Sequence, residues 1–321
     1  MEETKLNPEL LKKLDQLHKK FAAEGQNLED YLEGLLHADY VTYWDYIRLD
    51  TLLSLQNPRT TFKDEQIFIT YHQITELYFK LILFEISQVA EEQEMTVPVF
   101  IDKLHRVNRY YEQLVNSFSV LTEGMSREEF MMFRMTLMPS SGFQSVQYRL
   151  IEISCTDLVN LVHPGDVLWL SPDDSIDLYL EKLYWRAGAR NAKTGEKSLT
   201  LRQFEDQYEE KLKAHAKAYQ SVNLYQKSKK FLKQANKKQK AEIKGALRLL
   251  DQQANVHWPL SHFKAAVRHL YADKRTQTAT GGTNWRQYLP PRYQRINFFP
   301  DLWSEEEKEN WGKSWVLEQF D

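Results

Sequence analysis

The feature that most constrains the fold is a stretch of thirty residues, 64–93, that contains neither glycine nor proline. Wound as a helix, this stretch carries apolar side chains on more than one side. A helix that is apolar nearly all round belongs in the centre of a bundle. The sequence therefore predicts a long central helix in an all-α protein.

The rest of the composition supports this class. Only 11 glycines and 10 prolines occur in 321 residues, where average usage of the two would be roughly 12%. So few turn-forming residues argue against a sandwich or barrel of short strands and against a disordered chain. The net charge of −3 gives no general reason to expect nucleic acid as a partner.

Cellular location can also be predicted. Cys155 is the only cysteine, which excludes an intrachain disulfide and fits a reducing compartment. The N-terminal residues are too charged for a signal peptide, and no run of about 18 apolar residues is long enough to span a membrane. We expect a cytoplasmic protein that does not contact membranes.

The chain reads as one structural domain with three segments. Residues 1–170 form an N-terminal arm and a helical bundle, and Ser126 and Glu129 within them have the spacing of a capping box. Residues 171–245 form a polar helical insertion whose crowded lysines, at 227–244, we expect on a solvated surface. Residues 246–321 resume the apolar helical pattern and end in a glycine-containing loop and an aromatic tail.

His72 is the first candidate for chemistry. Helical spacing places Phe68, His72 and Glu76 on one face of the predicted central helix. An aromatic ring beside a histidine there suits the wall of a flat apolar pocket. The alternative is a core histidine bonded to a neighbouring helix, and both interpretations remain open on this spacing.

His262 is the second candidate. Ala265 and Ala266 follow it at helical spacing and leave room for a flat group beside the ring. A single histidine without Cys or carboxylate partners makes a poor zinc site, but it is the usual arrangement for proximal haem ligation. No Cys-x-x-Cys-His motif occurs, so such a haem would be non-covalent. A plain core histidine is the alternative.

Several motifs together resemble the tryptophan 2,3-dioxygenase family. They occur in family order between residues 40 and 289. The matching blocks are Tyr43 to Leu53, Asp64-Glu65 with Phe68 to Gln73, Glu76 to Lys80, Phe130 to Arg134, Pro139 to Arg149, Trp258 with His262, and Thr280 to Thr283.

The resemblance implies a haem-binding helical bundle with haem b as cofactor and assigns a role to each matching residue. His262 would be the axial ligand of the haem iron, and His72 the distal histidine that contacts the indole N–H. Phe68 would pack against the indole of the substrate. Arg134 would pair with the substrate carboxylate, and Phe130 would line the pocket for that carboxylate. Thr280 would close over the substrate ammonium. Segment 246–321 would then hold the proximal haem helix and the loop that closes over the substrate.

The resemblance also implies an assembly. Tyr43 and Tyr46 match positions that reach into the active site of a neighbouring subunit in this family. We therefore expect a homo-oligomer, with a tetramer sharing its active sites as the specific prediction.

The implied reaction inserts both atoms of O₂ across the indole C2=C3 bond of L-tryptophan and yields N-formyl-L-kynurenine, the first step of tryptophan catabolism. Two alternatives remain open at this point. One is a haem hydroxylase or peroxygenase that acts on another aromatic amino acid or indole, because the loop 279–285 has fewer glycines than the family pattern. The other is a non-catalytic haem-binding helical protein.

Overall fold

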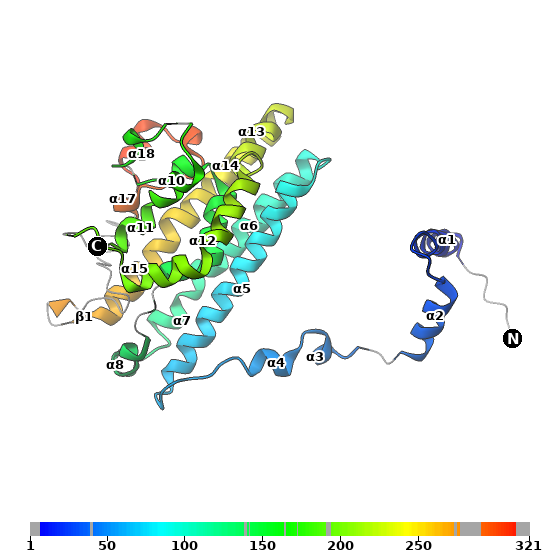
Figure 1. Ribbon diagram of the computed structural model, residues 1–321, viewed down its shortest axis with the longest axis horizontal. Helices are drawn as coiled ribbons and strands as arrows, with labels where there is room; N and C mark the ends of the chain where they lie inside the picture. Colours follow the sequence, from blue (N-terminus) through cyan, green and yellow to red (C-terminus); the bar gives the residue numbers. More distant parts are fainter. Residues whose placement is uncertain are drawn as a thin grey trace. The chain divides into compact units, whose positions relative to one another are not determined.

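The computed structural model describes residues 7–38, 41–137, 140, 142–163, 165–171, 173–190, 194–272, 275–276 and 290–312. Helices dominate these residues (Figure 1), which confirms the all-α prediction. The strands among them are one antiparallel pair of two residues each, β1 (Tyr271–Ala272) and β2 (Arg275–Thr276). None of the helices in the described ranges is long and apolar enough to cross a membrane.

The chain divides into two compact units, Met1–Leu55 and Gln56–Asp321. The helices of the smaller unit are α1 (Pro8–Ala23), α2 (Leu28–His37), α3 (Tyr43–Tyr46) and α4 (Leu49–Leu53). Asn7 and Asn27 cap the first two helices by accepting backbone N–H groups. Leu28 is the one large apolar side chain buried among this unit's described residues, so these helices have almost no core of their own.

The larger unit carries the remaining helices. Its α-helices are α5 (Asp64–Glu91), α6 (Val97–Ser117), α7 (Ser119–Thr122), α8 (Arg127–Phe133), α9 (Val146–Cys155), α10 (Ile176–Glu181), α11 (Tyr184–Gly188), α12 (Leu199–Tyr219), α13 (Leu224–Gln234), α14 (Lys237–Gln252), α15 (Trp258–Leu270), α17 (Pro291–Gln294) and α18 (Glu305–Glu309). Its 3₁₀ segments are η1 (Arg134–Leu137), η2 (Gly142–Gln144), η3 (Leu158–Leu161), η4 (Val167–Trp169) and η6 (Pro300–Leu302), and η5 (Gln253–His257) is a π-helix.

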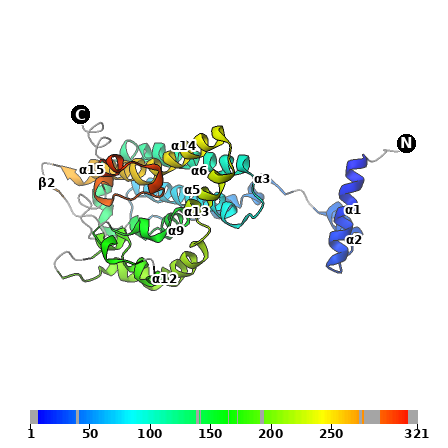
Figure 2. The same ribbon diagram turned by 90° about the horizontal axis from the view of Figure 1, so that it is seen from above.

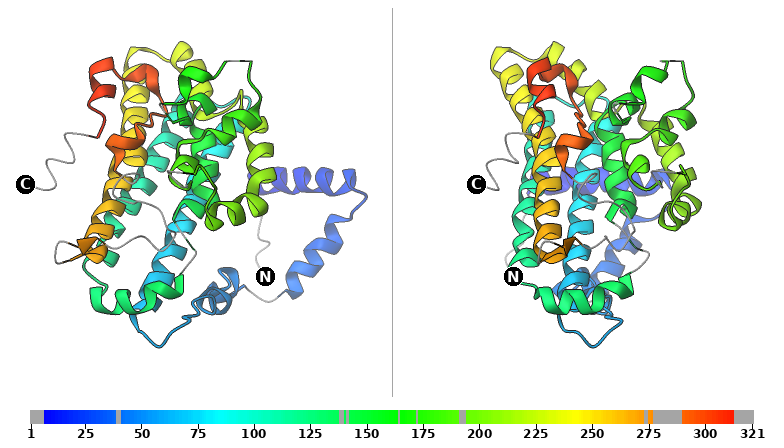
Figure 3. Two further views of the ribbon diagram at one scale, coloured as in Figure 1. Left: turned by 60° about the vertical axis from the view of Figure 1, so that its left-hand side comes forward. Right: turned by 90° about the vertical axis from the view of Figure 1, so that its left-hand side faces the viewer.

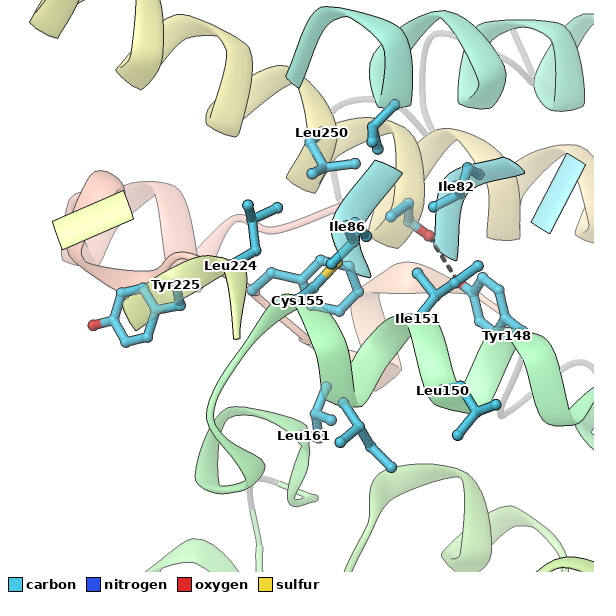
Figure 4. Packing of buried hydrophobic residues seen from close by; sticks show 14 of the residues in the cluster. Ile82, Ile86, Tyr148, Leu150, Ile151, Cys155, Leu161, Leu224, Tyr225 and Leu250 are labelled. Atoms are coloured by element: carbon cyan, nitrogen blue, oxygen red, sulfur yellow. Dashed lines mark hydrogen bonds between the residues drawn. The ribbon is translucent and has the colours of Figure 1, made fainter. Parts of the chain in front are cut away.

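The predicted long helix is α5, and it occupies the middle of the bundle. It packs against α6 on one side and α9 on another, while α14 packs against α6 and α12 covers α9 (Figures 2 and 3). Its core face carries fully buried side chains such as Ile82 and Ile86, which meet Ile151 and Cys155 of α9 (Figure 4). Each such burial contributes about 1.5–3 kcal/mol relative to an exposed position.

The polar segment with the crowded lysines, residues 171–245, contributes to the same core. Leu212, Phe231 and Ile243 belong to the main cluster of buried residues, and Phe231 stacks on Phe100 of α6 with ring centroids 4.2 Å apart. Most lysines of the segment are on the opposite, solvated side, although Lys227 is only 8% exposed. The boundaries of the insertion at residues 171 and 245 remain a prediction.

Candidate active site

The N-terminal ends of α5 and α8 are locked together by two reciprocal caps. The backbone N–H of Asp64, the first residue of α5, donates to the carboxylate of Glu129 over 2.9 Å. In return, the backbone N–H of Ser126, the N-cap of α8, donates to the carboxylate of Asp64 over 2.5 Å. Each carboxylate sits at the positive end of a helix, where it is stabilised. The two caps fix the helix that carries Phe68 and His72 against the helix that carries Phe130.

Half of the predicted capping box is present. The Ser126 side chain accepts the backbone N–H of Glu129, as the spacing predicts. The Glu129 carboxylate, however, caps α5 rather than its own helix, because Asp64 presents a free N–H to it. The spacing located the start of α8 but gave no sign of this partner.

His72 is oriented by its own helix. Its Nδ1 lies 2.7 Å from the carbonyl oxygen of Phe68, and a carbonyl can only accept, so Nδ1 carries the proton. In the neutral ring, Nε2 is then an acceptor. The Phe68 ring lies against the imidazole with centroids 4.1 Å apart. Burial lowers the pKa of His72 below its usual value, which favours this neutral form near pH 7.

His262 lies close enough to His72 for the protonation of one ring to affect the other. Burial, together with the positive charge of a protonated His72, lowers the pKa of His262 to about 4. Among the described residues, no hydrogen bond to the ring nitrogens of His262 is formed, and its one aromatic neighbour is Phe118, at 6.1 Å. Both imidazoles are solvent-accessible although protein surrounds them closely enough to shift their pKa values.

Aromatic rings connect the two histidines. Tyr71 contacts His72 edge-on at 5.5 Å and Phe118 at 5.7 Å. Phe118 in turn contacts Trp258 at 4.6 Å, one helical turn before His262. These ring contacts connect α5 to α15 through Phe118, and α7, which follows Phe118, packs against both helices.

A second group of aromatic rings continues from Phe68. Phe130 and Phe133 lie 6.2 and 5.9 Å from the Phe68 ring and 5.5 Å from each other. Arg134 follows directly and is 6% exposed. Burial lowers the pKa of its guanidinium, which nevertheless stays a cation because its usual value is above 12. A buried cation next to an aromatic cluster suits a substrate that is both aromatic and anionic.

The helix that presents His262 begins irregularly. Pro259 has no N–H and its ring would clash with the carbonyl of Asn255, so an α-helical turn cannot continue here. The backbone instead widens into the π-helical η5, and α15 begins at Trp258. Single π-helical turns are frequent at functional sites. Gly142 approaches from η2, so that a Cβ added to it would lie 3.3 Å from Cε1 of His262.

The other predicted site residues have different outcomes. Thr280 lies outside the described residues. Tyr43 and Tyr46 are in the smaller unit, where they are 71% and 80% exposed. Outside the predicted set, His269 is a buried histidine whose Nε2 donates to the carbonyl oxygen of Leu121 over 2.9 Å and whose Nδ1 has no hydrogen-bond partner among the described residues. Within the described ranges, no group of three or more His, Cys, Asp or Glu side chains is arranged to hold a metal ion.

Comparison with known proteins gives one answer. The family model of tryptophan 2,3-dioxygenase matches residues 14–162. A protein of Polaromonas naphthalenivorans named tryptophan 2,3-dioxygenase is 32% identical over 278 residues, which cover 82% of this chain and 90% of the relative. The chain belongs to the tryptophan 2,3-dioxygenase family. It is therefore an enzyme of the oxidoreductase class, and the family resemblance of the sequence motifs is confirmed.

Other members of the tryptophan 2,3-dioxygenase family agree over different spans. A protein of that name from Bacillus thuringiensis subsp. konkukian is 29% identical over 300 residues, 87% of this chain and 98% of the relative. One from Xenopus tropicalis is 37% identical over 147 residues, 41% of this chain and 36% of the relative.

Several residues around the site were not identified from the sequence. Phe118, Phe133 and Gly142 contact the predicted residues, but each belongs to a different element, and no spacing within the chain connects them. Gly142 stands in a motif that the resemblance used, yet its contact with His262 requires the packing of η2 on α15.

Proposed function

We propose that this enzyme is a haem-dependent dioxygenase that inserts both atoms of O₂ across the indole C2=C3 bond of L-tryptophan to give N-formyl-L-kynurenine. The observation that carries the proposal is the connection of His72 to His262 through the neighbouring rings of Tyr71 and Phe118, with the ring of His262 making no hydrogen bond to the described residues. Family membership supplies the reaction class, and the side chains around the two histidines supply a reason for the substrate.

His262 would hold haem b as the axial ligand. Burial keeps the imidazole neutral at pH 7, and a neutral ring nitrogen is the form that binds iron. Ala265 is buried and Ala266 partly buried one turn further along, so the helix beside His262 is narrow. When bound, the haem supplies the O₂ binding and electron transfer that the amino acids lack.

His72 would position the indole ring. Because Nδ1 donates to Phe68, the lone pair of Nε2 is available to accept the indole N–H. The indole N–H is a very weak acid, so this contact orients the substrate and is not an obligatory proton abstraction. The Phe68 and Phe130 rings would pack against the indole and keep water away.

Arg134 would pair with the substrate carboxylate. A guanidinium presents two parallel N–H groups that match a carboxylate, and an environment with little water strengthens the pair. Thr280 remains the predicted contact of the substrate ammonium.

The enzyme would act as a homo-oligomer, specifically a tetramer with shared sites. The smaller unit has almost no core of its own and exposes large apolar side chains, which include Val41, Tyr43, Trp44 and Tyr46. On the larger unit, α5 exposes the stripe Ile74, Leu77, Leu81 and Phe84, and Met132 and Met135 beside Arg134 are 63% and 59% exposed. Monomeric proteins rarely leave large contiguous apolar patches exposed, so each of these surfaces suits a subunit contact.

The decisive experiment supplies L-tryptophan, a reductant and isotopically labelled O₂ to the haem-loaded enzyme. We expect a product with the mass of N-formylkynurenine that carries two labelled oxygen atoms. A product with one labelled oxygen would indicate a hydroxylase instead, and turnover of indoles in preference to tryptophan would contradict the substrate assignment. Light scattering in the same preparation should give a tetramer; a fully active monomer would exclude shared sites.

A further inference from the structure

The C-terminal segment of the described chain, residues 290–312, folds back onto the helix that leads to His262. In Figure 3 this part, orange to red, lies beside α14 and η5. The connection is made at Asp251, in the last turn of α14. Its side chain is fully buried, and no cation forms an ion pair with it among the described residues.

Four donors surround this carboxylate. One oxygen accepts the backbone N–H of Phe298 over 2.8 Å and the side-chain amide of Asn255 over 2.7 Å. The other accepts the indole N–H of Trp303 over 2.8 Å and the backbone N–H of Phe299 over 3.2 Å. Asp251 thus joins the end of α14, the π-helical turn and the C-terminal segment at one point.

Apolar contacts continue the connection to the far side of the His262 helix. Trp303 and Trp311 pack edge to face at 4.7 Å and form a buried cluster with Val256 and Leu260. Leu260 precedes His262 by two residues, which places the two side chains on opposite faces of the helix. The C-terminal segment therefore supports the back of the helix whose front presents His262.

This support compensates for a weak point in the helix. The π-helical turn and Pro259 remove regular hydrogen bonds between residues 253 and 259, so local bonding alone fixes the direction of α15 poorly. A buried carboxylate without an ion pair is costly, and burial raises the pKa of Asp251 to about 6 despite its four donors. An apolar side chain would avoid this cost, but it would leave four buried donors without an acceptor.

We propose that Asp251 is a positioning residue for His262, which it holds in place through the π-helical turn and the Trp303 contact. The proposal rests on the assignment of His262 as the haem ligand for its functional meaning. The claim that Asp251 holds α15 in place does not depend on haem and concerns only residues of this chain.

The test compares Asp251→Asn with Asp157→Asn in the full-length chain. Asp157 is a matched control because its carboxylate accepts side-chain amides of Asn223 and Gln226 at the start of α13, away from α15. Trp303→Phe is a milder variant that removes one donor and keeps an aromatic ring. Each protein is measured with and without haem.

Without haem, amide hydrogen exchange over residues 253–265 is the readout. We expect Asp251→Asn to speed exchange there by roughly tenfold or more, since it replaces charge-assisted acceptors by an amide that faces two donors. Trp303→Phe should give a smaller increase at the same amides, and Asp157→Asn none. Equal increases in Asp251→Asn and Asp157→Asn, or no increase in either Asp251→Asn or Trp303→Phe, would overturn the proposal.

With haem, the iron–histidine stretching band of the ferrous protein is the readout. We expect a shifted or broadened band in Asp251→Asn at normal haem content and an unchanged band in Asp157→Asn. An unchanged band in Asp251→Asn would overturn the positioning role. If the wild type itself shows no histidine-ligated haem, the proposed function fails, and the exchange experiment still judges the support of α15 by itself.

Discussion

The two helices that carry the candidate histidines are built in opposite ways. α5 runs for 28 residues without interruption, and His72 on it is oriented by a hydrogen bond to a residue of the same helix. α15 has 13 residues and begins after a π-helical turn and a proline. His262 on it makes no hydrogen bond to a described residue, and its helix is held from behind by a distant segment.

This difference separates local from tertiary control of a site. The position of His72 relative to Phe68 follows from helical spacing and would survive changes elsewhere in the fold. The position of His262 depends on contacts between segments that are about fifty residues apart in the chain, such as Asp251 with Phe298. Substitutions far from His262 in the sequence should therefore disturb its position, whereas the position of His72 should respond only to changes within α5.

The largest expected effect is the loss of haem from His262→Ala. Removing the proposed axial imidazole should abolish stable haem binding, whereas His72→Ala should leave haem bound and impair turnover. Absorption spectra and haem content of the purified variants measure both. His257→Ala serves as the control on the same helix end. If that variant loses haem and His262→Ala does not, the assignment of the axial ligand is wrong.

The support of α15 by Asp251 should make the stability of the protein depend on pH. Because the pKa of Asp251 is raised from 3.8 to about 6 in the fold, the folded state binds more protons than the unfolded state between these values. The contribution of Asp251 to the free energy of unfolding should therefore fall by about 3 kcal/mol as the pH rises from about 4 through 6, against the opposite contributions of the buried histidines. Urea unfolding should show that this decrease is absent from Asp251→Asn. An identical pH profile in the variant would place the titrating group elsewhere.

The sequence was sufficient for the local features of the fold and the site. The long α5, the start of α8 at Ser126 and the shared face of Phe68 and His72 all follow from spacing and capping preferences. The family motifs added Arg134 and decided between the two interpretations of His262 that the spacing had left open. Tertiary features were inaccessible, because the cap of α5 by Glu129 and the acceptor role of Asp251 connect residues with no common period in the sequence.

Substitution of Arg134 should affect substrate binding and spare both histidine helices. Arg134→Ala would leave the tryptophan carboxylate without its partner and lower kcat/KM by roughly tenfold to a hundredfold, from about 1.5–3 kcal/mol for a charge-assisted bond. Arg134→Lys keeps the charge but loses the bidentate geometry and should lie between. Steady-state kinetics with tryptophan, and with indoles that lack the carboxylate, measure this. If amino-acid turnover is unchanged in Arg134→Ala, this residue does not bind the carboxylate.

The smallest expected effect tests how tightly the neighbours confine His262. The new methyl group of Gly142→Ala would lie 3.3 Å from Cε1 of the imidazole, closer than most side-chain contacts, so the ring must move by a few tenths of an ångström. Because His262 has no hydrogen bond to a described residue that resists this movement, we expect haem affinity to fall by roughly fivefold, equivalent to about 1 kcal/mol of overpacking. Haem titration followed by absorption measures the change. Gly245→Ala in α14 is the matched control, because nothing beyond its own helix backbone and chain neighbours lies within 4 Å of its added Cβ; it should keep wild-type affinity. If Gly142→Ala also keeps wild-type affinity, the ring of His262 tolerates displacement. Haem binding would then not depend on a precise position of His262 on α15.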